Sequence, residues 1–191
     1  SETREQHFDP FPARALAGLL DHPDAPVEGD VLPLPWHWLY FLDTPSREGT
    51  GLDGHPKRGG FLPPVPLPRR MWAAGELTLH EPLRLGAVTH KTSTVRSVEL
   101  KQGKAGALVF VTVAHELAQN GLPCLSELQH IVYREAPTGP GPLPPGEQAP
   151  TEADWQRTLQ PDPVMLFRFS ALTYNGHRIH YVRDYATREG F

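Results

Sequence analysis

Proline sets the limits on what this chain can fold into. The 191 residues include 22 prolines and 17 glycines. Proline cannot donate a backbone hydrogen bond to a helix interior or to a central strand. Eight prolines lie in residues 136–163 and predict a linker, and five lie in residues 56–68. Around this second group, over residues 43–70, we expect an ordered but irregular segment.

The rest of the composition is typical of a folded protein. Hydrophobic residues make up 39% of the chain, which is enough for one sizeable core. The net charge of −4 is not gathered into a block of like charges, so a nucleic-acid-binding or membrane-binding arm is not expected.

The sequence favours a reducing, cytoplasmic compartment. Its single cysteine, Cys124, has no partner for an internal disulfide. The first nine residues are polar and acidic and lack the apolar core of a secretory signal. The most apolar stretches, residues 36–42 and 108–114, are far shorter than the roughly 20 residues that cross a bilayer, so no membrane association is predicted.

The clearest periodicity predicts an antiparallel meander. Leu77 and Leu79 alternate with polar neighbours, and β-branched residues are frequent in residues 85–101. We expect strands at both places and two more at residues 107–117 and 122–133. Turns are predicted at residues 101–106 and at the Asn-Gly dipeptide of residues 120–121.

Short helices are predicted outside the meander. Residues 12–20 combine an early proline with leucines on one face. Residues 151–154 resemble a capping box, so one short helix is expected to interrupt the proline-rich linker. The 28 residues after it, 164–191, are too few to fold alone and are expected to dock on the first domain or on another chain.

The last segment contains the strongest functional signal. Residues 173–180 read Thr-Tyr-Asn-Gly-His-Arg-Ile-His. This run resembles the motif Thr-Gly-Asp-x-Asn-Pro-x-His of the MaoC-like, type 2 enoyl-CoA hydratases. Aligning Thr173 and His180 places Asn175 at the motif aspartate, His177 at the asparagine and Arg178 at the proline. The variant is similar to the subgroup that contains the mitochondrial hydroxyacyl-thioester dehydratase and the bacterial itaconyl-CoA and mesaconyl-CoA hydratases, as is the run of residues 54–72.

The resemblance implies an α+β hot dog fold, in which an antiparallel sheet wraps around a helix, in a double hot dog architecture with an incomplete second half. Residues 1–135 would form a degenerate first hot dog, 136–163 the linker and 164–191 the start of the catalytic second one. Only residues 69–74, before Gly75, are left for the helix of the first hot dog. A homodimer is also expected.

The implied reaction is the reversible hydration of a 2-enoyl thioester of CoA. It needs a base that deprotonates water, an acid that protonates Cα and hydrogen-bond donors to the thioester oxygen. Histidine suits proton transfer near neutral pH. We expect His180 to carry out both proton steps and the Asn175 amide to orient the water. His177, Arg178 and Tyr174 are expected to contact the substrate, a CoA thioester of a short acid such as itaconate or mesaconate.

The motif residues also fit a structural or a metal-binding role. Asn-Gly is a turn dipeptide by itself, and a lone histidine is more often structural than catalytic. His177 and His180 have the spacing of a metal pair, with His115 or Glu116 as third ligand. Zinc needs at least three protein ligands and no zinc motif is present. We therefore predict no metal, and no cofactor besides the CoA of the substrate.

A binding function is the main alternative. In the family, the motif is followed by a long helix whose N-terminal backbone N–H polarises the thioester, and then by further strands. This sequence stops at Phe191, before both. It would then be either a fragment or a non-catalytic acyl-thioester-binding or regulatory subunit that contributes part of a site to a partner chain.

Overall fold

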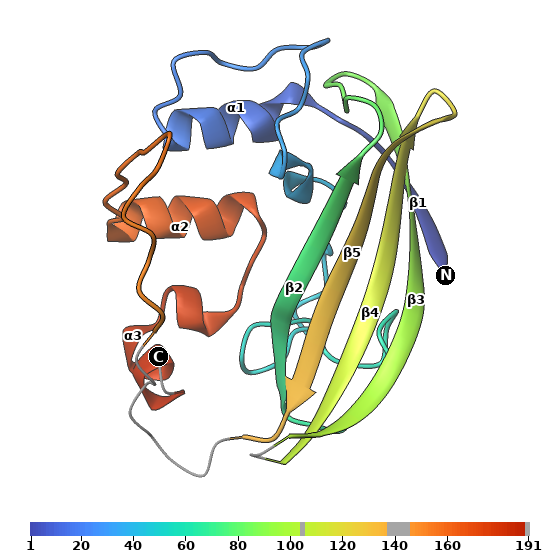
Figure 1. Cartoon of the computed structure of the whole chain (residues 1–191), viewed down its shortest axis with the longest axis vertical. Helices are drawn as coiled ribbons and strands as arrows, with labels where there is room; N and C mark the ends of the chain where they lie inside the picture. The colour runs from blue at the N-terminus through green and yellow to red at the C-terminus, as the bar shows by residue number, and fades with distance from the viewer. Residues whose placement is uncertain (104–105, 137–145, 190–191) are drawn as a thin grey trace.

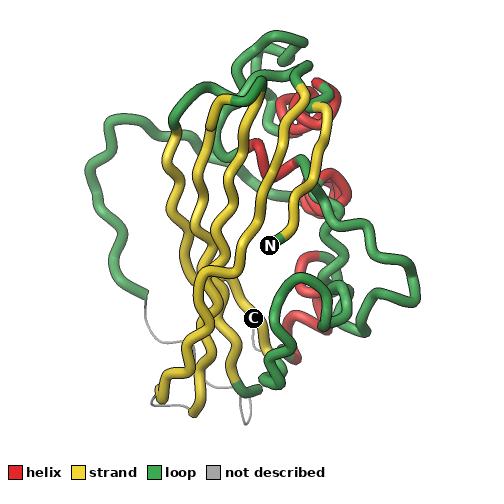
Figure 2. The backbone as a smooth tube through the Cα atoms, turned by 90° about the vertical axis from the view of Figure 1, so that its right-hand side faces the viewer, coloured by secondary structure: helices red, strands yellow, loops and turns green. Residues whose placement is uncertain are grey.

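A single antiparallel sheet dominates the computed structural model, which describes residues 1–103, 106–136 and 146–189. Its five strands lie in the order β1-β3-β4-β5-β2. Figure 1 shows helices α1, α2 and α3 one below another beside this sheet, and Figure 2 shows the helices on one side of the strands. The elements are β1 Glu2–His7, α1 Pro10–Leu19, η1 Trp36–Leu39, β2 Arg69–Leu79, β3 Val88–Gly103, β4 Gly106–Gln119, β5 Leu122–Arg134, α2 Pro163–Leu172, η2 Arg178–His180 and α3 Arg183–Arg188.

The predicted meander is confirmed for its last three strands, whereas its first strand, β2, pairs with β5 and not with β3. Strands β3, β4 and β5 follow one another as antiparallel neighbours. Asn120 and Gly121 form the turn between β4 and β5 with φ angles of 51° and 78°, in the left-handed region that this dipeptide tolerates. Residues 104–105 of the other predicted turn lie outside the described residues.

The helix predicted for residues 69–74 is wrong, because these residues begin β2. The strand pairs with β5 from Arg69 opposite Arg134 to Leu79 opposite Leu125, with one irregularity between Trp72 and Ala74. A helix here would leave the β5 backbone without partners along that edge. The strand expected at Leu77 and Leu79 therefore begins earlier in the chain, before Gly75.

Two further differences come from segments with weak patterns. Strand β1 lies at the edge of the sheet and pairs with β3. It was not predicted, because an edge strand open to solvent needs no alternation of apolar residues. The short helix expected to begin at the capping-box pattern of residues 151–154 is absent, because so short a helix has no core to pack on and is unstable alone. Residues 146–162 contain neither helix nor strand, and residues 137–145 of the predicted linker lie outside the described residues.

The first core cluster joins α1 to the sheet. Asp9 caps this helix by accepting a hydrogen bond from the Phe11 amide at 2.7 Å. The buried face of α1 packs with Leu117 of β4 and Leu125 of β5. Helix α1 begins at Pro10 and ends at Leu19, which confirms the helix predicted for residues 12–20 within about two residues.

The second cluster explains the proline-rich segment at residues 56–68. Val65 and Leu67 are buried against β4 and β5, including Tyr133. The Arg58 guanidinium donates hydrogen bonds to the carbonyl oxygens of Val65, Leu67 and Pro68, and it lies over the Tyr133 ring at 5.6 Å. The segment is ordered but irregular, as the sequence predicted, and the structure adds that it packs on the sheet and that Arg58 bonds three of its carbonyl oxygens.

The C-terminal segment docks on the rest of the chain, as expected. Helix α2 lies against α1, and Met165 and Leu172 pack on the first core cluster. Within the described residues, no helix combines the length and the apolar character needed to cross a bilayer.

Replacing Arg58 with methionine should lower the free energy of unfolding by about 1–2 kcal/mol, because three carbonyl oxygens lose a charged donor. Urea denaturation measures the change. Lys57→Met is the control, since Lys57 is exposed and its ammonium group has no hydrogen bond or ion pair among the described residues. Equal losses in the two variants would contradict this role of Arg58.

Candidate functional site

The loop of residues 50–56 forms a tight turn that presents two polar side chains. The amide of Gly51 donates to the His55 carbonyl oxygen at 2.7 Å. Asp53 Oδ1 accepts the His55 amide hydrogen at 3.1 Å, and Gly54 takes a φ of 91° between them. The Asp-Gly-His sequence supplies both the carboxylate that closes this turn and the glycine that the left-handed backbone favours.

The predicted motif forms a second loop, directly after α2. Tyr174 has a φ of 50°, and the Asn175 amide donates to the Ser170 carbonyl oxygen at 2.8 Å. Asn175 Oδ1 accepts the His177 amide hydrogen at 3.0 Å. The asparagine side chain therefore fixes the turn that leads into η2.

The two loops meet through their backbones at a pair of glycines. A Cβ atom on Gly54 would lie 1.8 Å from the Gly176 carbonyl oxygen, so no side chain fits there. The Arg178 amide donates to the Asp53 carbonyl oxygen at 2.9 Å, and its guanidinium reaches the Leu52 carbonyl oxygen at 3.4 Å. These contacts join segments that are far apart in the sequence.

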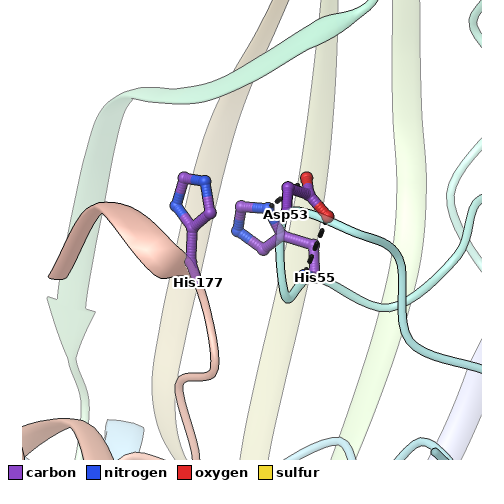
Figure 3. A group of neighbouring side chains, drawn as sticks. All are labelled: Asp53, His55 and His177. Atoms are coloured by element: carbon purple, nitrogen blue, oxygen red, sulfur yellow. Dashed lines mark hydrogen bonds and ion pairs between the residues drawn. The ribbon is translucent and has the colours of Figure 1, made fainter. Parts of the chain in front are cut away.

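The joined loops bring together a carboxylate and three imidazole rings. Asp53 Oδ2 lies 3.1 Å from His55 Nδ1, and Figure 3 shows the His55 ring between Asp53 and His177. The His55 and His177 rings are stacked, with centroids 3.9 Å apart and 29° between their planes. The His180 ring lies edge-on to His177 at 5.7 Å.

Two of the cavities that adjoin this cluster share residues with each other. The smaller has a volume of about 460 Å³, and the four residues of the cluster line it together with arginines, Trp72 and Tyr185. The larger has a volume of about 920 Å³ and reaches along the sheet to Lys91 and His115. His55 and Arg70 are part of the wall of both cavities.

The surroundings favour neutral His55 and His177 rings beside a charged Asp53 carboxylate. Burial and the neighbouring His55 lower the pKa of His177 to about 4. Burial also lowers the pKa of His55, helped by the positive charge of Arg70 and opposed by the hydrogen bond to Asp53. Burial alone would raise the pKa of Asp53, but the hydrogen bonds from His55 outweigh it and hold this pKa below its ordinary value.

The predicted site residues are divided between the two cavities. His177 and His180 line the smaller one, whereas Asn175 and Tyr174 line the larger one. We expected the Asn175 amide to orient the water; its side-chain oxygen already accepts a hydrogen bond from the His177 backbone amide.

Arg178 lines neither of these two cavities. Its guanidinium lies over the Tyr185 ring at 4.7 Å and reaches back to the Leu52 carbonyl oxygen. The geometry therefore gives Arg178 a positioning role between the two loops rather than a direct contact with a ligand.

Sequence reasoning missed Asp53 and His55. A signal was present, because His55 lies in the run of residues 54–72 that resembles the bacterial enzymes, and Asp53 directly precedes it. An acidic residue two positions before a histidine can orient the imidazole ring by a hydrogen bond, as it does here.

A metal ion suits the cluster less well than proton transfer does. Asp53, His55 and His177 each offer a ligand atom, and these atoms lie within 4.8 Å of one another. Zinc requires ring nitrogens that converge on a point about 2 Å away, but stacked rings face each other. In the described part of the chain, this group contains neither His115, which bonds to Ser93 at 2.8 Å, nor Glu116, the two residues considered from the sequence as a third ligand.

Comparisons with known proteins place the chain in one family. The family model of hydroxyacyl-thioester dehydratase type 2 matches residues 35–191. The chain is 47% identical over 179 residues to mesaconyl-C(4)-CoA hydratase of Chloroflexus aurantiacus, covering 93% of this chain and 64% of that protein. It is 25% identical over 177 residues to the mitochondrial hydroxyacyl-thioester dehydratase type 2 of Schizosaccharomyces pombe, covering 80% of this chain and 58% of that protein. The chain thus spans less than two thirds of either relative.

Solved structures support the hot dog fold. HtdX of Mycobacterium tuberculosis superposes with a TM-score of 0.61 at 17% identity, covering all of this chain and 70% of that one. A MaoC-like dehydratase from Phytophthora capsici gives a TM-score of 0.54 at 14% identity, covering all of this chain and 67% of that one. The antiparallel sheet is therefore that of a hot dog protein, and the division into domains stays a prediction.

Gly54→Ala should separate the two loops, because the new methyl group collides with the Gly176 carbonyl oxygen. The pKa of His177, followed by NMR, should then rise toward its ordinary value. Gly59→Ala is the matched control, because Gly59 has a φ of 102° but nothing within 4 Å of its added Cβ. The same change in both variants would show that backbone strain, and not the contact, is responsible.

Acidification should weaken the fold through His177. The unfolded chain binds a proton at the ordinary pKa of 6.5, but the folded protein binds it only near 4. The contribution of His177 to the free energy of unfolding is therefore present above pH 6.5 and is lost as the pH falls toward 4. Urea denaturation across this range should show a shallower pH dependence for His177→Asn than for the parent, and identical slopes would contradict the assignment.

Proposed function

Because the chain belongs to the hydroxyacyl-thioester dehydratase type 2 family, we propose that it is a hydro-lyase that reversibly hydrates a 2-enoyl thioester of CoA to the 3-hydroxyacyl thioester. The observation that carries this proposal is the cleft of about 460 Å³ in which His55, His177, His180 and Asp53 meet. It joins proton-transfer groups to a cavity of a size that holds a small acyl group.

The reaction needs proton transfer and no redox partner. Water loses a proton, its oxygen bonds to Cβ, and a proton is added at Cα. In our proposal His180 carries out both proton steps, since its ring lies at the exposed side of the cluster. Asp53 and His55 act as positioning residues, because the carboxylate fixes the His55 ring on which His177 stacks.

The larger cavity is proposed to hold the rest of the substrate. Asn175 and Tyr174 line it next to His55, where the two cavities meet. The Asn175 side-chain nitrogen is free to orient water or the thioester, because only its oxygen bonds to the loop among the described residues. His177 contacts the substrate from the smaller cavity.

The acyl group is proposed to be a short dicarboxylic acid. The supporting observation is the 47% identity to a relative named mesaconyl-C(4)-CoA hydratase. A homodimer is part of this proposal, supported by exposed Trp72, Leu77 and Leu79 on the edge strand β2. The cytoplasmic location stays a prediction.

Incubation with mesaconyl-C(4)-CoA and crotonyl-CoA in isotope-labelled water should yield hydrated product by mass spectrometry. His180→Ala and Asn175→Ala should each lower kcat by about a hundredfold or more, since a positioned acid–base group contributes about a hundredfold to ten-thousandfold. Activity should survive chelation by EDTA. His22→Ala, far from the motif in sequence, is the control.

Different failures point to different errors. Near-parental activity of His180→Ala would overturn its catalytic role, and full activity of Asn175→Ala would leave that residue structural. Binding of acyl-CoA without turnover of any enoyl-CoA would favour the acyl-thioester-binding subunit instead of the enzyme.

A further inference from the structure

Arg70 has a position that the proposed reaction does not yet use. It is the second residue of β2, lies opposite Tyr133 of β5 and is half-buried. It is part of the wall of both cavities, as His55 is. Arg70 therefore lies where the acyl end of a substrate would pass the histidine cluster.

The neighbouring arginines are already paired. Arg69 bonds to the Glu189 carboxylate at 2.7 Å, and Arg58 bonds to backbone carbonyl oxygens. Arg4, on the larger cavity, pairs with Asp43 at 2.9 Å. The Arg70 guanidinium, in contrast, has neither a hydrogen bond nor an ion pair among the described residues.

A half-buried guanidinium without an acceptor is costly, so an anionic ligand at this position would be stabilising. The positive charge of Arg70 acts on both His55 and His177, which supports its closeness to the cluster. An anion bound to Arg70 would therefore lie beside the reacting atoms and not at a remote end of the cavity.

We propose that Arg70 forms a carboxylate subsite, which selects acyl thioesters whose Cβ bears a free carboxylate. The inference rests on the proposed function and names its substrate class. In such a thioester the carboxylate is one bond from the carbon that receives water, so it must lie beside the histidines. Guanidinium binds a carboxylate through two parallel hydrogen bonds, which fixes the orientation of the double bond.

The phosphates of CoA are the other possible anions. They are separated from the thioester by the whole pantetheine arm, so they do not reach the cluster while the double bond lies there. Arg70 binding to phosphate would affect every CoA ester alike, whereas a carboxylate subsite affects only the acids. This difference makes the two sources separable by experiment.

The test compares mesaconyl-C(4)-CoA with 3-methylcrotonyl-CoA, in which a methyl group replaces the free carboxylate. In the full-length protein, Arg70→Met should lower kcat/KM for the mesaconyl ester by about 10- to 100-fold, the effect of losing a charged hydrogen bond, and change the methylcrotonyl ester less than about threefold. Arg70→Lys should give an intermediate loss, because a point charge lacks the paired donors. Lys57→Met, which removes an exposed charge from the larger cavity, should leave the ratio unchanged.

An unchanged ratio of kcat/KM for the two esters would overturn the subsite. If both values fell equally, phosphate binding or a structural role of Arg70 would be favoured. Should Arg70→Met fail to fold, the Arg70→Lys ratio decides. If the protein hydrates neither ester, calorimetry with succinyl-CoA and butyryl-CoA separates the two proposals. Tighter binding of succinyl-CoA that is lost in Arg70→Met, or weakened in Arg70→Lys, would keep the subsite while the enzyme proposal fails. Equal affinities for the two esters in the parent would overturn the subsite.

Discussion

The contact between Gly54 and Gly176 is the constraint on which the candidate site depends. It is a backbone-to-backbone contact with no room for a Cβ atom, and the adjacent hydrogen bond from the Arg178 amide to the Asp53 carbonyl oxygen fixes its register. The histidines come from different ends of the chain, so neither loop forms the cluster alone. Stacking of His55 on His177 follows from this contact.

Each loop is held by a different layer of the fold. The irregular segment after His55 is fastened to the sheet through Arg58 and the buried Val65 and Leu67. The motif loop follows α2, which packs on α1. Proline restricts the unfolded chain, so an irregular segment rich in proline loses less entropy on folding than a flexible loop would. The proline content that limits helix and strand therefore helps to position the site.

The features that could be predicted from the sequence are those that depend on a local pattern of residues. Strands β3, β4 and β5 are recognisable by their β-branched residues, and the motif identified His177 and His180. Residues 69–74, the first part of β2, were mistaken for a helix because their pairing with β5, not their own composition, decides their structure. The spacing of Asp53 and His55 was a local signal, but their role depends on a contact with His177, more than a hundred positions away, which the sequence does not reveal.

Substrate charge and proton affinity are coupled in this geometry. An unpaired Arg70 and stacked rings keep His55 and His177 neutral, since each added positive charge would meet another at close range. An anion bound to Arg70 would cancel part of its positive charge and raise the proton affinity of both rings. An acidic acyl group would therefore change the charge on the two rings that lie beside His180, the proposed base, whereas a neutral acyl group would leave their proton affinities unchanged.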